Sequence, residues 1–136
     1  MKKVKATIEM GLTGEYKYSI YMDSTGLNYG VNGIGCTVNE AKEDFIEAYE
    51  EIRRTFQEEG KDFTEVEFLY NYDVASFLEY YAYAFSLAGL GRITGINQRQ
   101  LSHYLNGSSK PSRKTVKRIE QKIREFGKDI SDIRLC

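Results

Sequence analysis

The sequence predicts an α+β fold, with a β-β-β-α-β antiparallel-sheet domain over residues 1–71 and an all-α domain over residues 72–136. Alternation of apolar and polar residues, which is typical of half-buried strands, occurs only in the first half of the chain. Charge divides the chain as well. Residues 1–85 carry 8 Lys and Arg against 16 Asp and Glu, a net of −8, whereas residues 86–136 carry 11 against 4, a net of +7. This asymmetry indicates either two units with oppositely charged partners or two solvated surfaces that differ.

The expected strands lie at the two ends of the first domain. Residues 4–10 alternate apolar and polar side chains, and after a turn at residues 11–14 the alternation resumes over residues 16–22. A third, glycine-broken strand is expected from residue 27 to about residue 36, and a fourth over residues 66–70. The first two form a predicted hairpin, and we expect the whole sheet to be antiparallel.

One long amphipathic helix is expected between the third and fourth strands. Thr37 and Glu40 match a capping box, in which the two side chains satisfy free amide groups at the start of a helix. Apolar residues then recur every three or four positions as far as Phe56, and Gly60 suits the helix C-cap. Asp73 is expected to cap a further helix through about residue 85, and every recognisable segment after that is helical.

The composition excludes several classes of protein. Hydrophobic residues at 41% and aromatic residues at 13% are values of a globular chain rather than a disordered one. The longest uncharged run, residues 24–39, is broken by glycines and asparagines and is shorter than the roughly 20 apolar residues that cross a bilayer. The first residues contain no signal-peptide core. We therefore expect a cytoplasmic protein that does not bind membranes.

The sequence predicts neither a metal site nor an enzyme. Cys36 and Cys136 form no CxxC pair, and with the single histidine His103 they fall short of the about four ligands of a structural zinc ion. Most acidic residues of the first domain lie on its predicted helix, where they form a solvated face, and the others are scattered over the strands. We expect no cofactor and no catalytic residue.

Residues 86–107 have the pattern of two short helices joined by a tight turn. Gly91 is small where the helices would approach each other, and Gly95 accepts the positive φ that the turn requires. Asn97 can cap the second helix, and Gln100 can complete a capping box. The buried contacts between the helices are expected from Leu90, Ile96, Leu101 and Leu105.

The side chains that packing and capping leave over suit contacts with DNA. The second helix is expected to end at Asn106-Gly107 and to present four residues to solvent: Gln98, Arg99, Ser102 and His103. Gln and Arg make paired hydrogen bonds to the edges of adenine and guanine in the major groove. Ser112 is expected to cap a last helix with an apolar stripe. Basic residues suited to backbone phosphates follow the second helix: Lys110, Arg113, Lys114, Lys117 and Arg118.

Residues 73–126 resemble the Cro/repressor-type helix-turn-helix family, also called the lambda-repressor-like domain. Three runs carry the resemblance: Gly95-Ile96-Asn97-Gln98, Leu101-Ser102-His103-Tyr104-Leu105-Asn106-Gly107 and Lys110-Pro111-Ser112. The resemblance implies that residues 98, 99 and 103 contact bases, and that Asn106 and the loop of residues 108–110 contact phosphate. Leu87 departs from the family, whose members often carry a polar residue there. The expected DNA-binding set is Asn97, Gln98, Arg99, Gln100, Ser102, His103, Asn106, Ser108 and Lys110.

The first domain resembles the HicB antitoxin family. The β-β-β-α-β order is joined to the run Gly35-Cys36-Thr37-Val38-Asn39-Glu40-Ala41, a version of the family's G-x-T-x-x-E-A signature. The loop before it, residues 31–34, lacks the proline that family members usually carry. The resemblance implies a type II toxin–antitoxin protein that masks a small basic RNA-cleaving toxin, HicA, and represses its own operon.

Three alternatives remain at this level. The second domain could be a helical hairpin that only packs or dimerises. The whole chain could be a stand-alone transcription regulator whose first domain binds a ligand or mediates assembly. The first domain could also be a nucleic-acid enzyme, which would need carboxylates such as Glu9 and Asp23 to converge. For DNA binding we expect a homodimer or a higher homo-oligomer on a palindromic operator, because one helix reads too few base pairs.

Overall fold

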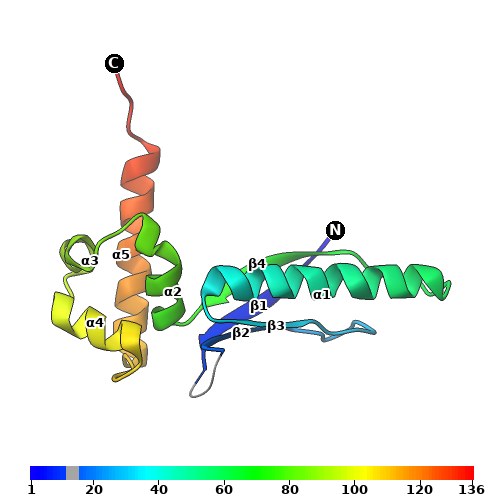
Figure 1. The fold of residues 1–136 in the computed structure, drawn as a ribbon. Helices are drawn as coiled ribbons and strands as arrows, with labels where there is room; N and C mark the ends of the chain where they lie inside the picture. The colour runs from blue at the N-terminus through cyan, green and yellow to red at the C-terminus, as the bar shows by residue number, and fades with distance from the viewer. Residues whose placement is uncertain (12–15) are drawn as a thin grey trace. The chain divides into compact units, whose positions relative to one another are not determined.

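The computed structural model describes residues 1–11 and 16–136, and over these the chain folds into two compact units, Met1–Tyr80 and Tyr81–Cys136 (Figure 1). The described residues form a four-stranded mixed sheet, five α-helices and one short 3-10 helix, so the predicted α+β class is confirmed. The expected turn at residues 11–14 falls mostly on residues 12–15, which lie outside the described residues. The units divide after residue 80 rather than residue 71, because helix α2 (Val74–Tyr80) packs against the sheet.

The sheet of the first unit has the spatial order β3-β2-β1-β4. Its strands are β1 (Lys2–Met10), β2 (Tyr18–Met22), β3 (Asn32–Gly35) and β4 (Val66–Tyr72). The pairs β1–β2 and β2–β3 are antiparallel, but β4 runs parallel to β1, with Phe68 opposite Val4. The expectation of an entirely antiparallel sheet is therefore wrong at β4. A long crossover allows parallel pairing, and α1 (Val38–Glu58) supplies it.

The third strand is shorter than the sequence predicts. Only Asn32–Gly35 pairs as a strand, although Tyr29 and Val31 before it are buried. Tyr29 is held by side-chain contacts instead. Its ring stacks on Phe63 with centroids 4.7 Å apart, and its hydroxyl donates to the carbonyl oxygen of Thr64 at 2.6 Å. The alternation of residues 27–31 thus marks burial in the core and not strand pairing.

Helix α1 begins and ends at the residues that the sequence indicates. The hydroxyl of Thr37 accepts from the amide of Glu40 at 3.1 Å, and the Glu40 carboxylate accepts from the amide of Cys36 at 2.9 Å. These two bonds satisfy donors at the start of the helix, where no intrahelical acceptor exists. The chain leaves the helix through Gly60, which has φ 68°. The helix lies along one face of the sheet (Figure 1).

Two glycines bring α1 against the neighbouring strand β3. A Cβ placed on Gly33 would lie 2.6 Å from both the carbonyl oxygen of Ala41 and the Cβ of Phe45. Gly35 meets the backbone of Ala41 even more closely. Any side chain at these positions would push the helix off the sheet. Phe45 is fully buried beneath this contact, with its ring edge-on to that of Phe68.

Lys42 ties α1 to β4 and α2 through three tyrosines. Its ammonium nitrogen lies 4.5 Å from the ring centroid of Tyr70, 5.1 Å from that of Tyr72 and 3.9 Å from that of Tyr80. It also donates to the Tyr72 hydroxyl at 2.6 Å. Burial lowers the pKa of Lys42, while the electron-rich ring faces favour its charged form.

Asp73 starts α2 as expected, but the helix is shorter than predicted. One Asp73 oxygen accepts from the amide of Ser76 at 2.8 Å, and the other accepts from the amide of Met10 at 2.9 Å. The carboxylate therefore caps the helix and fastens it to β1. The helix ends at Tyr80, and a 3-10 turn over Tyr81–Tyr83 replaces its predicted continuation.

The second unit consists of α3 (Leu87–Thr94), α4 (Gln98–Asn106) and α5 (Arg113–Ser131) after that turn. Helix α3 packs against both α4 and α5. Four apolar side chains are fully buried between them: Leu90, Leu101, Tyr104 and Ile119. Leu90 and Leu101 are among the predicted contacts, whereas Ile96 and Leu105 are only half-buried. Tyr104 is a core residue that the sequence analysis did not single out.

Candidate nucleic-acid interface

A tight turn of three residues sets the angle between α3 and α4. Gly95 adopts φ 72° and ψ 11°, and its amide donates to the carbonyl of Gly91 at 2.9 Å. A side chain on Gly91 would crowd the turn, since its Cβ would lie 3.1 Å from the carbonyl oxygen of Ile96. The buried Thr94 hydroxyl donates to the Leu90 carbonyl at 2.7 Å and accepts from the Ile96 amide at 3.2 Å. The two predicted glycine roles are confirmed.

Asn97 starts α4 as a capping residue. Its side-chain oxygen accepts from the amide of Arg99 at 2.8 Å. The expected second half of the capping box is wrong, because the amide nitrogen of Gln100 donates to the Ser109 hydroxyl at 3.3 Å instead. Gln100 thus braces the loop after α4 from inside and is only partly exposed. Its predicted place among the DNA contacts is the least accessible of the set, apart from Ser102.

The remaining predicted residues lie on the outer side of α4 or in the loop that follows it. Gln98, Arg99 and His103 are exposed, while Ser102 is half-buried. The opposite side of the helix carries Leu101 and Tyr104, which are anchored in the core of the unit. The polar face is therefore presented by a helix whose orientation is held from behind.

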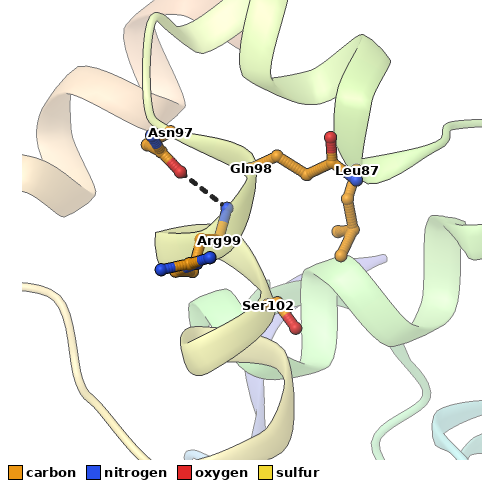
Figure 2. Close-up of a pocket in the computed structure, with 5 residues that line it drawn as sticks. All are labelled: Leu87, Asn97, Gln98, Arg99 and Ser102. Atoms are coloured by element: carbon orange, nitrogen blue, oxygen red, sulfur yellow. Dashed lines mark hydrogen bonds between the residues drawn. The ribbon is translucent and has the colours of Figure 1, made fainter.

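An open groove runs beside the first turn of α4. It is lined by Leu87, Asn97, Gln98, Arg99 and Ser102. Figure 2 shows the Gln98 side chain extending from α4 towards Leu87 at the start of α3, while the Arg99 side chain leaves on another side of the helix. Leu87, which the sequence analysis noted only as a departure, gives Gln98 an apolar neighbour.

The loop after α4 is organised by short hydrogen bonds. The Asn106 side-chain oxygen accepts from the Ser108 amide at 2.9 Å, and the Ser108 hydroxyl lies 3.0 Å from Nδ1 of His103. Gly107 adopts φ 79° and ends the helix. Asn106, Ser108 and His103 therefore form one polar cluster at the C-terminal end of α4, as the resemblance implies for residues that share a phosphate-facing edge. Ser109 belongs to this loop and was missed, since a serine in a loop carries no distinctive sequence signal.

A basic surface follows this loop. All five predicted cations are exposed: Lys110, Arg113, Lys114, Lys117 and Arg118. Within residues 1–11 and 16–136, neither these side chains nor Arg99 form an ion pair with a carboxylate. The acidic residues Glu120 and Glu125 instead pair with Arg124 and Lys122 further along α5. The surface near α4 thus keeps its positive charge for an external anion.

Other kinds of site find no support in the described part of the chain. No group of three or more His, Cys, Asp or Glu side chains is placed to hold a metal ion there. None of its helices has the length and apolarity needed to cross a membrane. Comparison of the chain with protein-family models, curated proteins and solved structures gave no match.

Proposed function

We propose that the unit Tyr81–Cys136 is a Cro/repressor-type helix-turn-helix domain that binds double-stranded operator DNA with α4 in the major groove. One observation carries the proposal: Gln98, Arg99 and His103 are exposed on a helix whose opposite side is fixed in the core by Leu101 and Tyr104. An α-helix fits the width of the B-DNA major groove, where each base pair presents a distinct set of donors and acceptors.

Each side chain has a role in this proposal. Arg99, which has no carboxylate partner, donates two hydrogen bonds to a guanine, and Gln98 pairs with an adenine. The Asn106, Ser108 and Lys110 edge contacts a phosphate, and the cations of α5 neutralise further phosphates. Leu87 replaces a polar backbone contact at the start of α3, and its methyl groups suit the C5-methyl group of a thymine.

The Arg99→Ala variant tests the base contact. We expect a loss of roughly 1–3 kcal/mol in operator affinity, together with relaxed selectivity at one base pair. Arg124→Ala is the matched control, since Arg124 is an exposed arginine of the same unit that already pairs with Glu120. The operator is first selected from a random DNA pool, and binding is measured at constant salt. Equal affinities for the wild type and Arg99→Ala would contradict the placement of α4.

We further propose that the first unit is a HicB-like antitoxin domain, so that the whole chain neutralises a HicA-like toxin and represses the shared operon from the cytoplasm as a homodimer or higher homo-oligomer. The net charge of −8 suits a basic RNA-binding partner. The G-x-T-x-x-E-A residues build the junction of β3 and α1: Gly35 permits the close approach, and Thr37 and Glu40 cap the helix. The signature therefore supports the fold and does not identify the surface that meets the toxin.

A stand-alone transcription regulator is the second candidate, and co-expression separates the two. If the protein encoded by the adjacent reading frame is small and basic, co-purifies with this chain and loses its RNA cleavage in the complex, the antitoxin proposal holds. If the neighbouring product neither binds nor affects growth, the first unit serves ligand binding or assembly. Metal-dependent cleavage by the purified chain itself, lost on mutation of Glu9 or Asp23, would contradict both.

A further inference from the structure

The apolar residues of α5 and of the residues just after it form a regular heptad repeat. They are spaced alternately by three and four positions: Val116, Ile119, Ile123, Phe126, Ile130 and Ile133. This 3-4 spacing is the pattern with which two helices pack along a common seam. It continues past the part of α5 that the three-helix unit needs for its own core.

The core of the unit covers only the first part of this seam. Ile119 is 5% exposed, and Phe126 packs edge-on against Phe85 with ring centroids 5.9 Å apart. Beyond Phe126 the burial stops, with Ile130 50% and Ile133 58% exposed. In Figure 1 the last turns of α5 extend past α3 and α4.

The chain keeps a helical course as far as the last residue of the repeat. Asp132 has φ −90° and ψ −5°, and the amide of Ile133 donates to the carbonyl of Ile130 at 3.2 Å. Ile130 and Ile133 therefore lie on consecutive turns, as two positions of one seam require.

We propose that the segment from Phe126 to Ile133 pairs in parallel with the same segment of a second copy of this chain. Charge complementarity selects this occupant and this direction. Asp129 and Arg134 flank the seam, and in a parallel pair the residue before one seam position lies opposite the residue five positions later in the other helix. Asp129 of each copy thus faces Arg134 of the other. Neither side chain forms an ion pair among the described residues.

The inference goes beyond the proposed function, because the pairing is a property of α5 and its test uses no DNA. It also supplies what DNA binding by a two-fold protein requires, since it holds two copies of α4 in one assembly. Loss of DNA binding in a protein that remains dimeric would contradict the DNA proposal alone. A monomer that still binds DNA would contradict the pairing alone.

The first test is the oligomeric state, measured by sedimentation velocity over a series of protein concentrations. The wild type is expected to be a dimer, and Ile130→Glu is expected to shift it to a monomer, because the carboxylate would enter the apolar seam. Ile34→Glu is the matched control, since Ile34 is 48% exposed on strand β3 of the other unit. Circular dichroism verifies that each variant is folded. A monomeric wild type, or a dimer that Ile130→Glu leaves intact, overturns the proposal.

The second test concerns direction. Cys36 and Cys136 are both exposed, and Cys136 follows Ile133 by three positions. In a parallel pair the two Cys136 residues lie at the same end, so oxidised glutathione should accept two electrons and two protons from their thiols and leave an intermolecular disulfide. The covalent dimer should persist in Cys36→Ser and vanish in Cys136→Ser. A charge swap completes the test: Asp129→Arg should weaken the dimer, and adding Arg134→Asp should restore it. A covalent dimer that needs Cys36, or no rescue by the double swap, overturns the parallel pairing.

Discussion

The two units use their residues in opposite ways. Among the described residues, the unit Met1–Tyr80 buries fifteen apolar side chains, whereas Tyr81–Cys136 buries four. The first unit thus invests most of its sequence in an interior that is rich in aromatic contacts. The second holds a small core and spends its sequence on caps, a turn and exposed cations. Such a difference indicates that a fold can be inferred best from the first unit, and a chemical activity from the surface of the second.

Removal of the largest buried side chain of the first unit should separate the units most clearly. Phe45→Ala leaves a cavity beneath the contact of α1 with β3, and we expect the first unit to lose roughly 3–5 kcal/mol of stability. Hydrogen exchange resolved along the chain should show faster exchange in residues 1–80 and unchanged exchange in α3 and α4. Equal loss of protection in both units would mean that they unfold as one, and the comparison would fail.

Alkaline pH should also weaken the first unit selectively. Burial is the main cause that raises the pKa of Tyr18 and of Tyr29 from 10.0 to about 12. The folded state therefore keeps these protons when the unfolded chain releases them. The stabilisation is complete below pH 10 and falls as the pH rises towards 12, by on the order of 2 kcal/mol for each residue.

The measurement is denaturant unfolding across this pH range. Tyr29→Phe should lower the stability at neutral pH, through loss of the bond to Thr64, but should show a shallower decline above pH 10. Tyr16→Phe is the control, because Tyr16 is 51% exposed. An unchanged slope in Tyr29→Phe would show that its hydroxyl ionises normally in the folded protein.

Lys42 tests whether the interior of the acidic unit depends on a cation. Lys42→Met keeps the length of the side chain but removes the charge between Tyr70, Tyr72 and Tyr80, and we expect a loss of about 1–2 kcal/mol. Lys61→Met is the control on the exposed end of the unit, where the lysine pairs with Glu59. A stability equal to that of the wild type would show that methionine packing replaces the cation fully.

The smallest expected effect concerns a single phosphate contact in the second unit. Lys117→Gln should reduce the slope of log affinity against log salt by about 0.9 and weaken binding equally for all DNA sequences. Lys61→Gln in the first unit should leave the slope unchanged. If both variants changed the slope alike, net charge and not a local contact would govern binding.

The sequence by itself determined the features that depend on neighbouring residues. The caps at Thr37, Asp73 and Asn97 and the positive φ of Gly95 follow from groups a few positions apart, whose hydrogen bonds form in any chain with that local order. The period of apolar residues likewise placed the main helices and strands. The exposed positions of Gln98, Arg99 and His103 could be predicted because Leu101 and Tyr104 occupy the other side of the same short helix.

Only the tertiary structure decided the features that join distant segments. The parallel pairing of β4 with β1, the attachment of α2 to the sheet and the tyrosine contacts of Lys42 each connect residues at least 28 positions apart. The bond from Gln100 to Ser109 likewise depends on the path of the loop after α4. Such contacts are chosen by the packing of whole elements, which fixes which partner is within reach, and no local pattern of residues carries that information.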